Sequence, residues 1–67
     1  MGENFNENLK KARLESGLSQ KELSENIGVA KSTYSLYESG KREPNVNTIK
    51  KIASALNVSA DILLGTE

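Results

Sequence analysis

The chain has 67 residues, with nine basic and nine acidic side chains, a formal net charge of zero, and neither cysteine nor histidine. A chain this short has room for one core and no disulfide to reinforce it, so we expect a single domain over residues 1–67 whose stability comes from packed helices. No run of residues approaches the ~20 apolar side chains of a membrane-spanning helix, and no secretion signal opens the chain, so we expect a cytoplasmic protein that does not enter a membrane.

The charges are unevenly distributed along the chain. Residues 29–51 carry five basic and two acidic side chains, whereas residues 1–28 carry four and five, and residues 52–67 carry none and two. The neutral total argues against a nucleic-acid partner, and the basic middle third argues for one. Charge alone leaves open a nucleic-acid surface or an ordinary solvated one.

The apolar pattern, taken in chain order, predicts five helices and no strand, and therefore an all-α fold. The predicted helices cover about residues 5–16, 19–27, 31–38, 45–56 and 59–64. Each is followed by a residue type that readily adopts left-handed backbone geometry, as expected where helices end: Gly17, Gly28, Gly40, Asn57 and Gly65.

Start signals support four of these helices. In the first, Asn4 stands as a cap with Glu7 three residues on. Ser19 and Glu22 have the spacing of a capping box, in which the hydroxyl and the carboxylate each accept a free backbone N–H group. Asn45 and Ser59 stand where they can cap the fourth and fifth helices.

The second and third predicted helices are joined by a short turn, Ile27-Gly28-Val29-Ala30. A turn of this length with glycine near its start is typical of a helix-turn-helix, and Val29 is placed to pack between the two helices. Two helices joined at a glycine also occur in many other folds.

The third helix has one small and polar face. At 100° per residue, one sector holds Lys31, Ser32, Ser35, Leu36 and Ser39, and the opposite side holds Ala30, Thr33, Tyr34 and Tyr37. Small side chains allow a helix to enter a major groove about 12 Å wide, where lysine donates to guanine and serine bonds several base edges. Leu36 would contact a thymine methyl group, touch the fourth helix or simply lie exposed.

Three stretches of the sequence stand out together: GLSQKEL at residues 17–23, IGVAKSTYS at residues 27–35 and YESGKREP at residues 37–44. With IASALNVS at residues 52–59, they resemble the phage repressor and Cro family, also called the XRE family, of helix-turn-helix DNA-binding domains. The resemblance implies a compact five-helix bundle like that of lambda repressor, with the second and third helices forming the helix-turn-helix.

The resemblance also implies a role for individual residues. Gln20 matches a residue whose amide bonds a DNA phosphate and braces the recognition helix. The base-reading positions of the family match Lys31, Ser32, Ser35 and Leu36. The family makes further phosphate contacts through backbone amides and cations in the loop after the third helix, and through the start of the fourth helix. The matching positions in this sequence are Ser39, Gly40, Lys41, Arg42, Asn45 and Asn47.

Other matching positions are structural. Arg13 and Glu38 match a pair that ties the first helix to the end of the third, and we expect this pair to be partly buried because Glu38 falls beside the inner face. Tyr34 and Tyr37 match core positions. Ala30 departs from the family, which usually has serine or threonine there as the cap of the recognition helix, and alanine cannot accept the free N–H groups.

No catalytic or metal-binding pattern is present in the sequence. It has no His or Cys, no glycine-rich phosphate loop and no acidic cluster with metal-ligand spacing, so we expect no enzyme, no cofactor, no metal and no small-molecule ligand. The alternative to a DNA-binding regulator is a protein-interaction module, such as an antitoxin or an adaptor, that keeps the fold with weak or no DNA binding. The zero net charge favours that alternative.

A single module of this size buries too little surface for tight specific binding, so we predict a homodimer on a near-palindromic site in double-stranded DNA. Its two recognition helices would lie about 34 Å apart. A short last helix cannot easily bury three consecutive apolar residues, so we assign Leu63 to the core and Ile62 and Leu64 to the dimer interface. Repression is the expected effect, because an occupied operator blocks polymerase.

Overall fold

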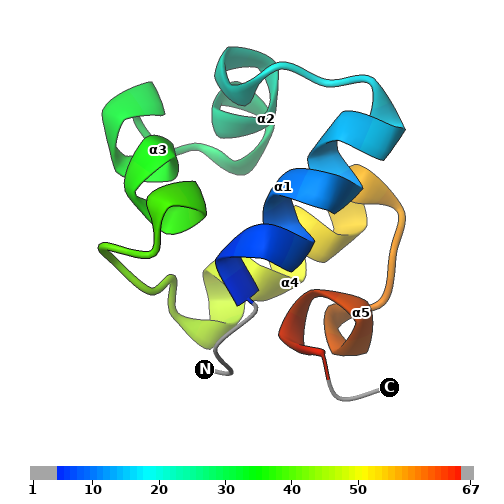
Figure 1. The fold of residues 1–67 in the computed structure, drawn as a ribbon. Helices are drawn as coiled ribbons and strands as arrows, with labels where there is room; N and C mark the ends of the chain where they lie inside the picture. Colours follow the sequence, from blue (N-terminus) through cyan, green and yellow to red (C-terminus); the bar gives the residue numbers. More distant parts are fainter. Residues whose placement is uncertain (1–4, 66–67) are drawn as a thin grey trace.

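The computed structural model describes residues 5–65, and that range contains five helices and no strand (Figure 1). The helices are α1 (Phe5–Ser16), α2 (Gln20–Ile27), α3 (Lys31–Ser39), α4 (Val46–Leu56) and α5 (Ala60–Leu64). The predicted all-α fold is confirmed, and each helix lies within one residue of its predicted range.

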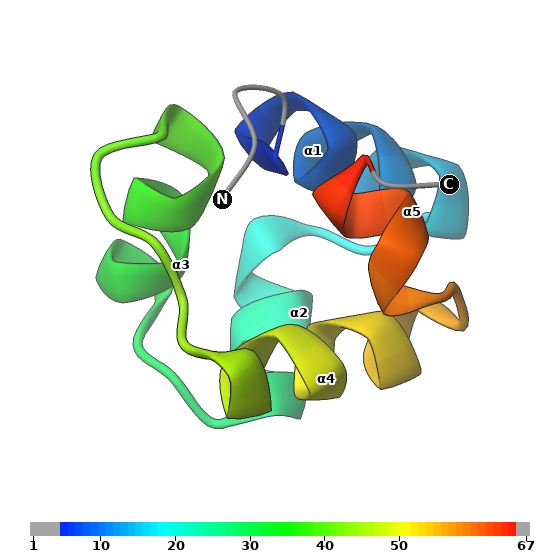
Figure 2. The same ribbon diagram turned by 90° about the horizontal axis from the view of Figure 1, so that it is seen from below.

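The first helix organises the bundle. α1 packs against α3, α4 and α5, and α2 packs against α3 and α4. In both ribbon views α3 and α5 lie at opposite edges of the molecule (Figures 1 and 2). The recognition helix of the predicted motif is therefore well separated from the last helix of the chain.

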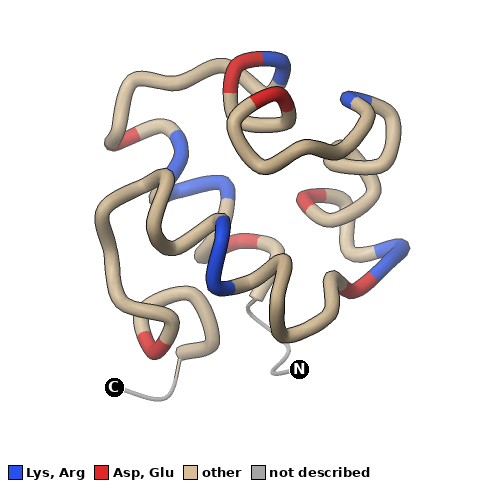
Figure 3. Tube along the Cα trace, turned by 180° about the vertical axis from the view of Figure 1, so that it is seen from behind, with Lys and Arg blue, Asp and Glu red and all other residues tan. Residues whose placement is uncertain are grey.

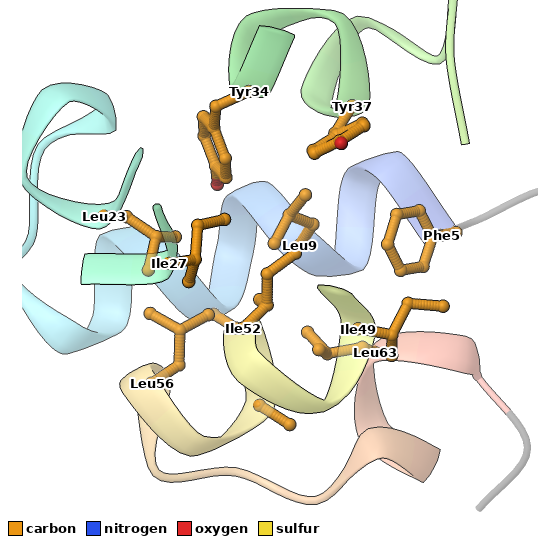
Figure 4. Packing of buried hydrophobic residues seen from close by; sticks show 12 residues of the cluster. Phe5, Leu9, Leu23, Ile27, Tyr34, Tyr37, Ile49, Ile52, Leu56 and Leu63 are labelled. Carbon is orange, nitrogen blue, oxygen red and sulfur yellow. The ribbon is translucent and has the colours of Figure 1, made fainter. Parts of the chain in front are cut away.

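All five helices contribute to one core, whose close-up shows the larger side chains converging between the helices (Figure 4). At its centre, the fully buried apolar side chains are Leu9, Leu23, Tyr34, Ile52 and Leu63. The rest of the core consists of Phe5, Ala12, Ile27, Tyr37, Ile49, Ala53 and Leu56. The core positions predicted for Leu63 and the two tyrosines are confirmed.

The caps predicted at Ser19, Asn45 and Ser59 are present, and the one predicted at Asn4 lies outside the described residues. The Ser19 hydroxyl accepts the Glu22 N–H at 3.0 Å, and the Glu22 carboxylate accepts the Ser19 N–H at 2.9 Å, which completes the capping box. The Asn45 side-chain oxygen accepts the Thr48 N–H at 2.8 Å. These contacts satisfy N–H groups that would otherwise have no partner in the first turn of a helix.

α3, which the resemblance matches to a recognition helix, begins without a side-chain cap. Ala30 occupies the cap position with φ −67° and ψ 147°, which is the backbone geometry of a capping residue, but its methyl group accepts no hydrogen bond. Ala30 is also exposed, so a larger side chain fits there.

Replacing Ala30 should show what this missing cap costs. Threonine and valine have nearly the same shape, so the variants Ala30→Thr and Ala30→Val differ mainly in one hydroxyl group that can accept the free N–H groups. We expect the threonine variant to be more stable than the valine variant by about 1 kcal/mol in denaturant unfolding. Equal stability of the two variants would mean that another group already satisfies the start of α3.

Candidate nucleic-acid interface

The polar face of α3 points away from the bundle. Lys31 and Ser32 are exposed, Ser35 is half-buried, and Leu36 is 36% exposed. On the other side of the helix the two tyrosines point into the core (Figure 4). The four residues matched to base-reading positions therefore share the outer surface of one helix, and Leu36 is not part of the core.

The turn between α2 and α3 has the geometry that its sequence predicts. Gly28 adopts φ 76°, in the left-handed region that favours glycine. The next residue, Val29, donates its N–H to the Ser24 carbonyl at 3.0 Å and packs, partly buried, against the core. This turn fixes the angle at which α3 leaves α2.

A buried ion pair joins α1 to the end of α3. Arg13 Nε lies 2.6 Å from Glu38 Oε2, and a second guanidinium nitrogen, Arg13 Nη2, donates to Glu38 Oε1 at 3.2 Å. The side chains are only 10% and 5% exposed. The remaining nitrogen, Arg13 Nη1, donates to the Leu18 carbonyl at 2.9 Å, which also ties the pair to the segment before α2.

Two further side chains donate to the same carboxylate. Gln20 Nε2, at the start of α2, donates to Glu38 Oε1 at 3.1 Å. The Tyr34 hydroxyl donates to Glu38 Oε2 at 2.5 Å. The sequence predicted packing alone for Tyr34 and not this bond, although Tyr34 and Glu38 are four residues apart on one helix, a spacing at which side chains meet.

The donors around Glu38 determine its charge. Burial by itself would raise the pKa of the Glu38 carboxyl, but hydrogen bonds from Arg13, Tyr34 and Gln20 outweigh it and lower the pKa below the ordinary value. Burial raises the pKa of the Tyr34 hydroxyl, and the neighbouring Glu38 raises it further. Glu38 is therefore an ionised acceptor and Tyr34 a neutral donor near neutral pH.

The loop after α3 uses its backbone amides internally. Lys41 and Arg42 both donate their N–H groups to the Leu36 carbonyl, at 3.0 Å and 3.3 Å, and Gly40 donates to the Tyr37 carbonyl at 3.4 Å. The Ser39 hydroxyl also donates to the Leu36 carbonyl, at 3.1 Å. The backbone amides that the resemblance assigned to phosphate therefore already cap α3, which leaves the exposed side chains of Lys41 and Arg42.

Basic positions lie at both ends of α3. Seen from behind, the start of α3 and the loop that follows it carry Lys or Arg along the same edge of the molecule (Figure 3). Asn45 and Asn47, at the start of α4, are exposed, and they follow this loop closely in the sequence. The polar face of α3 is thus bordered along the chain by positive side chains.

The two residues predicted for a dimer interface differ in exposure. Ile62 is 41% exposed, whereas Leu64 is partly buried and packs against the core. Ile62 borders a groove of about 310 Å³ between α1 and α5, which Lys11, Ala12 and Asp61 also line. Of the two residues, Ile62 offers the larger apolar surface.

Residues 5–65 contain neither a cluster of metal ligands nor a membrane-spanning helix. No group of three or more acidic, histidine or cysteine side chains in that range is arranged to hold a metal ion. None of the helices described is long and apolar enough to cross a bilayer.

The buried carboxylate predicts a pH dependence of stability. Because the pKa of Glu38 is lower in the folded chain than its ordinary value of 4.5, its ionised form stabilises the fold above that pH, and this contribution is lost as the pH falls through the folded pKa. We expect Glu38→Gln to cost about 3 kcal/mol at neutral pH, since it leaves Arg13 buried without a counter-charge.

Denaturant unfolding of both proteins between pH 3 and pH 7 would measure this. The difference in stability should be constant above about pH 4.5 and shrink below it. The capping carboxylate Glu22, whose pKa is lowered by its bonds to Ser19, is present in both proteins and cancels in the difference. A difference that stays constant down to pH 3 would contradict an ionised, hydrogen-bonded Glu38.

Comparisons with known proteins agree with this geometry. A family model described as helix-turn-helix matches residues 9–63. An uncharacterised HTH-type transcriptional regulator of Bacillus subtilis, YqaE, is 41% identical over 63 residues, which are 94% of this chain and 54% of that protein. The cryptic phage CTXphi transcriptional repressor RstR of Vibrio cholerae is 37% identical over 54 residues, which are 81% of this chain and 49% of RstR.

A solved structure is also similar along almost its whole length. The crystal structure of the restriction-modification controller protein C.AhdI from Aeromonas hydrophila superposes with a TM-score of 0.85 at 32% identity, and the match covers 90% of this chain and 87% of that one. The chain spans about half the length of the two regulators above. It belongs to the XRE-type helix-turn-helix family of DNA-binding domains, the phage repressor and Cro family that its sequence resembles, and this family is not one of enzymes.

Proposed function

We propose that this chain is the DNA-binding part of a transcriptional regulator, which binds a near-palindromic site in double-stranded DNA as a homodimer and reads the major groove with α3. The observation that carries the proposal is the division of α3 into two faces. Its inner face is buried through the tyrosines, and its outer face presents Lys31, Ser32, Ser35 and Leu36.

The outer face suits base edges in the major groove. The two serines are short, so they let the helix approach the bases closely, and their hydroxyl groups can donate or accept. Lys31 can donate to guanine O6 or N7. Leu36, which is 36% exposed, offers an apolar contact for a thymine methyl group.

Phosphate contacts would fix the position of α3 in the groove. The strongest candidates are the Gln20 amide and the cations of Lys41 and Arg42, since the loop amides are already bonded within the protein. The remaining proposed phosphate contacts are Ser39, Gly40, Asn45 and Asn47. With about four phosphate contacts per subunit, or eight per dimer, log affinity should fall against log salt with a slope of about −7.

Dimerisation through α5 agrees with the shape of the domain. The Cα trace extends over 27 × 23 × 20 Å, and α3 and α5 lie at opposite edges of it. Two such domains that meet at α5 can place their outward α3 helices about 34 Å apart, which is one turn of DNA. Ile62 would lie at the centre of this interface and Leu64 beside it, with Lys11 and Asp61 as charges of opposite sign near the groove.

We propose repression as the effect on transcription. A dimer seated on an operator blocks polymerase without any further contact, and the relative RstR is a transcriptional repressor. The alternative is a protein-interaction module that keeps this fold with weak or no DNA binding, and the zero net charge of the chain favours it. Binding experiments separate the two.

Selection from a random duplex library tests the DNA-binding proposal. The wild-type protein should enrich a near-palindromic site, and Lys31→Ala and Ser35→Ala should each lose preference at particular base pairs, by about 1–3 kcal/mol per position. Lys10→Ala on α1 is a matched control, because it removes an exposed lysine outside the proposed interface. It should leave the selected site unchanged.

The same proteins should then be titrated with the enriched duplex at several salt concentrations. A slope of about −7 is expected for wild type. Failure to enrich any sequence at low salt, or an affinity that does not depend on salt, would rule out the DNA-binding proposal and favour the interaction module.

Sedimentation equilibrium tests the proposed dimer. Ile62→Asp places a charge in the proposed apolar contact and should shift the protein to monomer, because two buried carboxylates would face each other across a two-fold axis. Leu14→Asp is the control, since Leu14 is 58% exposed on α1 and outside the α5 contact. A dimer that survives Ile62→Asp and dissociates with Leu14→Asp would place the interface on α1 instead.

A further inference from the structure

The four hydrogen bonds to Glu38 are divided evenly between its two oxygens. Oε2 accepts the Tyr34 hydroxyl at 2.5 Å and Arg13 Nε at 2.6 Å. Oε1 accepts Arg13 Nη2 at 3.2 Å and Gln20 Nε2 at 3.1 Å. The carboxylate is therefore held from α1 on both oxygens and from α3 on Oε2, and Oε1 also accepts the amide of Gln20, the first residue of α2.

This arrangement decides which way the Gln20 amide faces. An ionised carboxylate can only accept hydrogen bonds, so Gln20 must turn its NH₂ group toward Glu38. That group has two hydrogens, and the bond to Glu38 Oε1 uses one of them. The second N–H is left to donate to another acceptor, and Gln20 is only half-buried, so that acceptor can come from outside the protein.

We infer that Tyr34 is a positioning residue for the phosphate contact of Gln20. Its hydroxyl, together with Arg13, fixes the plane of the Glu38 carboxylate so that Oε1 holds the Gln20 amide with one N–H directed outward. The inference rests on the proposed function, because it concerns the Gln20 phosphate contact in that proposal. It assigns a polar role to a fully buried residue of the core.

Tyr34 is the member of this cluster that can be tested without dismantling it. Tyr34→Phe removes one hydroxyl and keeps the ring in the core, and Glu38 retains its three bonds from Arg13 and Gln20. Without the hydroxyl, the carboxylate is held by Arg13 and Gln20 but no longer from α3 itself, so the Arg13–Glu38 pair can shift and Oε1 holds the Gln20 amide less firmly. Tyr37→Phe is a matched control on the same helix, because Tyr37 is buried and packs edge-on against Tyr34, 6.2 Å between ring centroids, yet its hydroxyl is not a donor to Glu38.

A double-mutant cycle measures whether Tyr34 acts through Gln20. Wild type, Tyr34→Phe, Gln20→Ala and the double variant are titrated with the duplex enriched by wild type, at one salt concentration. We expect Tyr34→Phe to weaken binding about three- to tenfold when Gln20 is present, and less than about twofold when it is absent. Tyr37→Phe should change affinity by less than about twofold in both backgrounds.

A second measurement does not depend on DNA. The two side-chain N–H resonances of Gln20 in the free protein should shift in Tyr34→Phe and stay in place in Tyr37→Phe. A general loss of packing would shift the resonances of many residues and not those of Gln20 alone.

The outcomes separate the two proposals. Equal losses from Tyr34→Phe in both backgrounds, unchanged Gln20 resonances, or no effect of Gln20→Ala on affinity would each overturn the role of Tyr34 while leaving DNA binding intact. No binding of any duplex by wild type would instead overturn the proposed function, and the Gln20 resonances would still show whether Tyr34 orients the amide.

Discussion

One buried carboxylate determines how the helices of this domain meet. Moving a charge out of water is costly unless hydrogen bonds and a counter-charge replace the lost solvation, so Glu38 can be buried only where its donors come together. Those donors lie on α1, at the start of α2 and on α3 itself. The cost of leaving any of these bonds unmade restricts the orientation of α3 relative to the two helices before it. Hydrophobic contacts alone would not restrict it in this way, because apolar side chains pack without directional bonds.

The two faces of α3 follow from this anchoring. A nine-residue helix is too short to be stable alone, and this one lacks a side-chain cap at its start. Tertiary contacts must therefore stabilise it, and these are the buried tyrosines on the inner face and the bonds to Glu38 near the end. The outer face contributes little to the fold, so it can carry small polar residues. A surface that stability does not constrain is suited to recognition, because its side chains can change without loss of the fold.

The features predicted correctly from residue spacing were the local ones, whereas the Arg13–Glu38 pair, 25 residues apart, was predicted through the family resemblance. The capping box of Ser19 and Glu22, the left-handed residues after the helices and the assignment of Leu63 to the core all depend on spacings within one or two turns of the chain. The Tyr34 bond and the internal use of the loop amides depend instead on which of several partners a donor finds in three dimensions. The amides of Lys41 and Arg42 illustrate this, because a phosphate and the Leu36 carbonyl are both good acceptors. Sequence shows that these donors exist, but it does not show which acceptor each one takes.

The burial of Glu38 also affects how the zero net charge of the chain should be interpreted. Among residues 29–51 there are five basic and two acidic side chains, and one of the two acids is Glu38, whose charge is matched within the core by Arg13 from α1. Once Glu38 is set aside as the partner of Arg13, which lies outside that segment, residues 29–51 carry five basic side chains and one acidic side chain, Glu43. A net charge counted over the whole chain averages this segment with acidic residues on α1, α2 and α5. The field that an approaching polyanion meets depends on the local distribution and falls off over about 10 Å in ordinary salt, so the basic segment matters more at the proposed surface than the neutral total does.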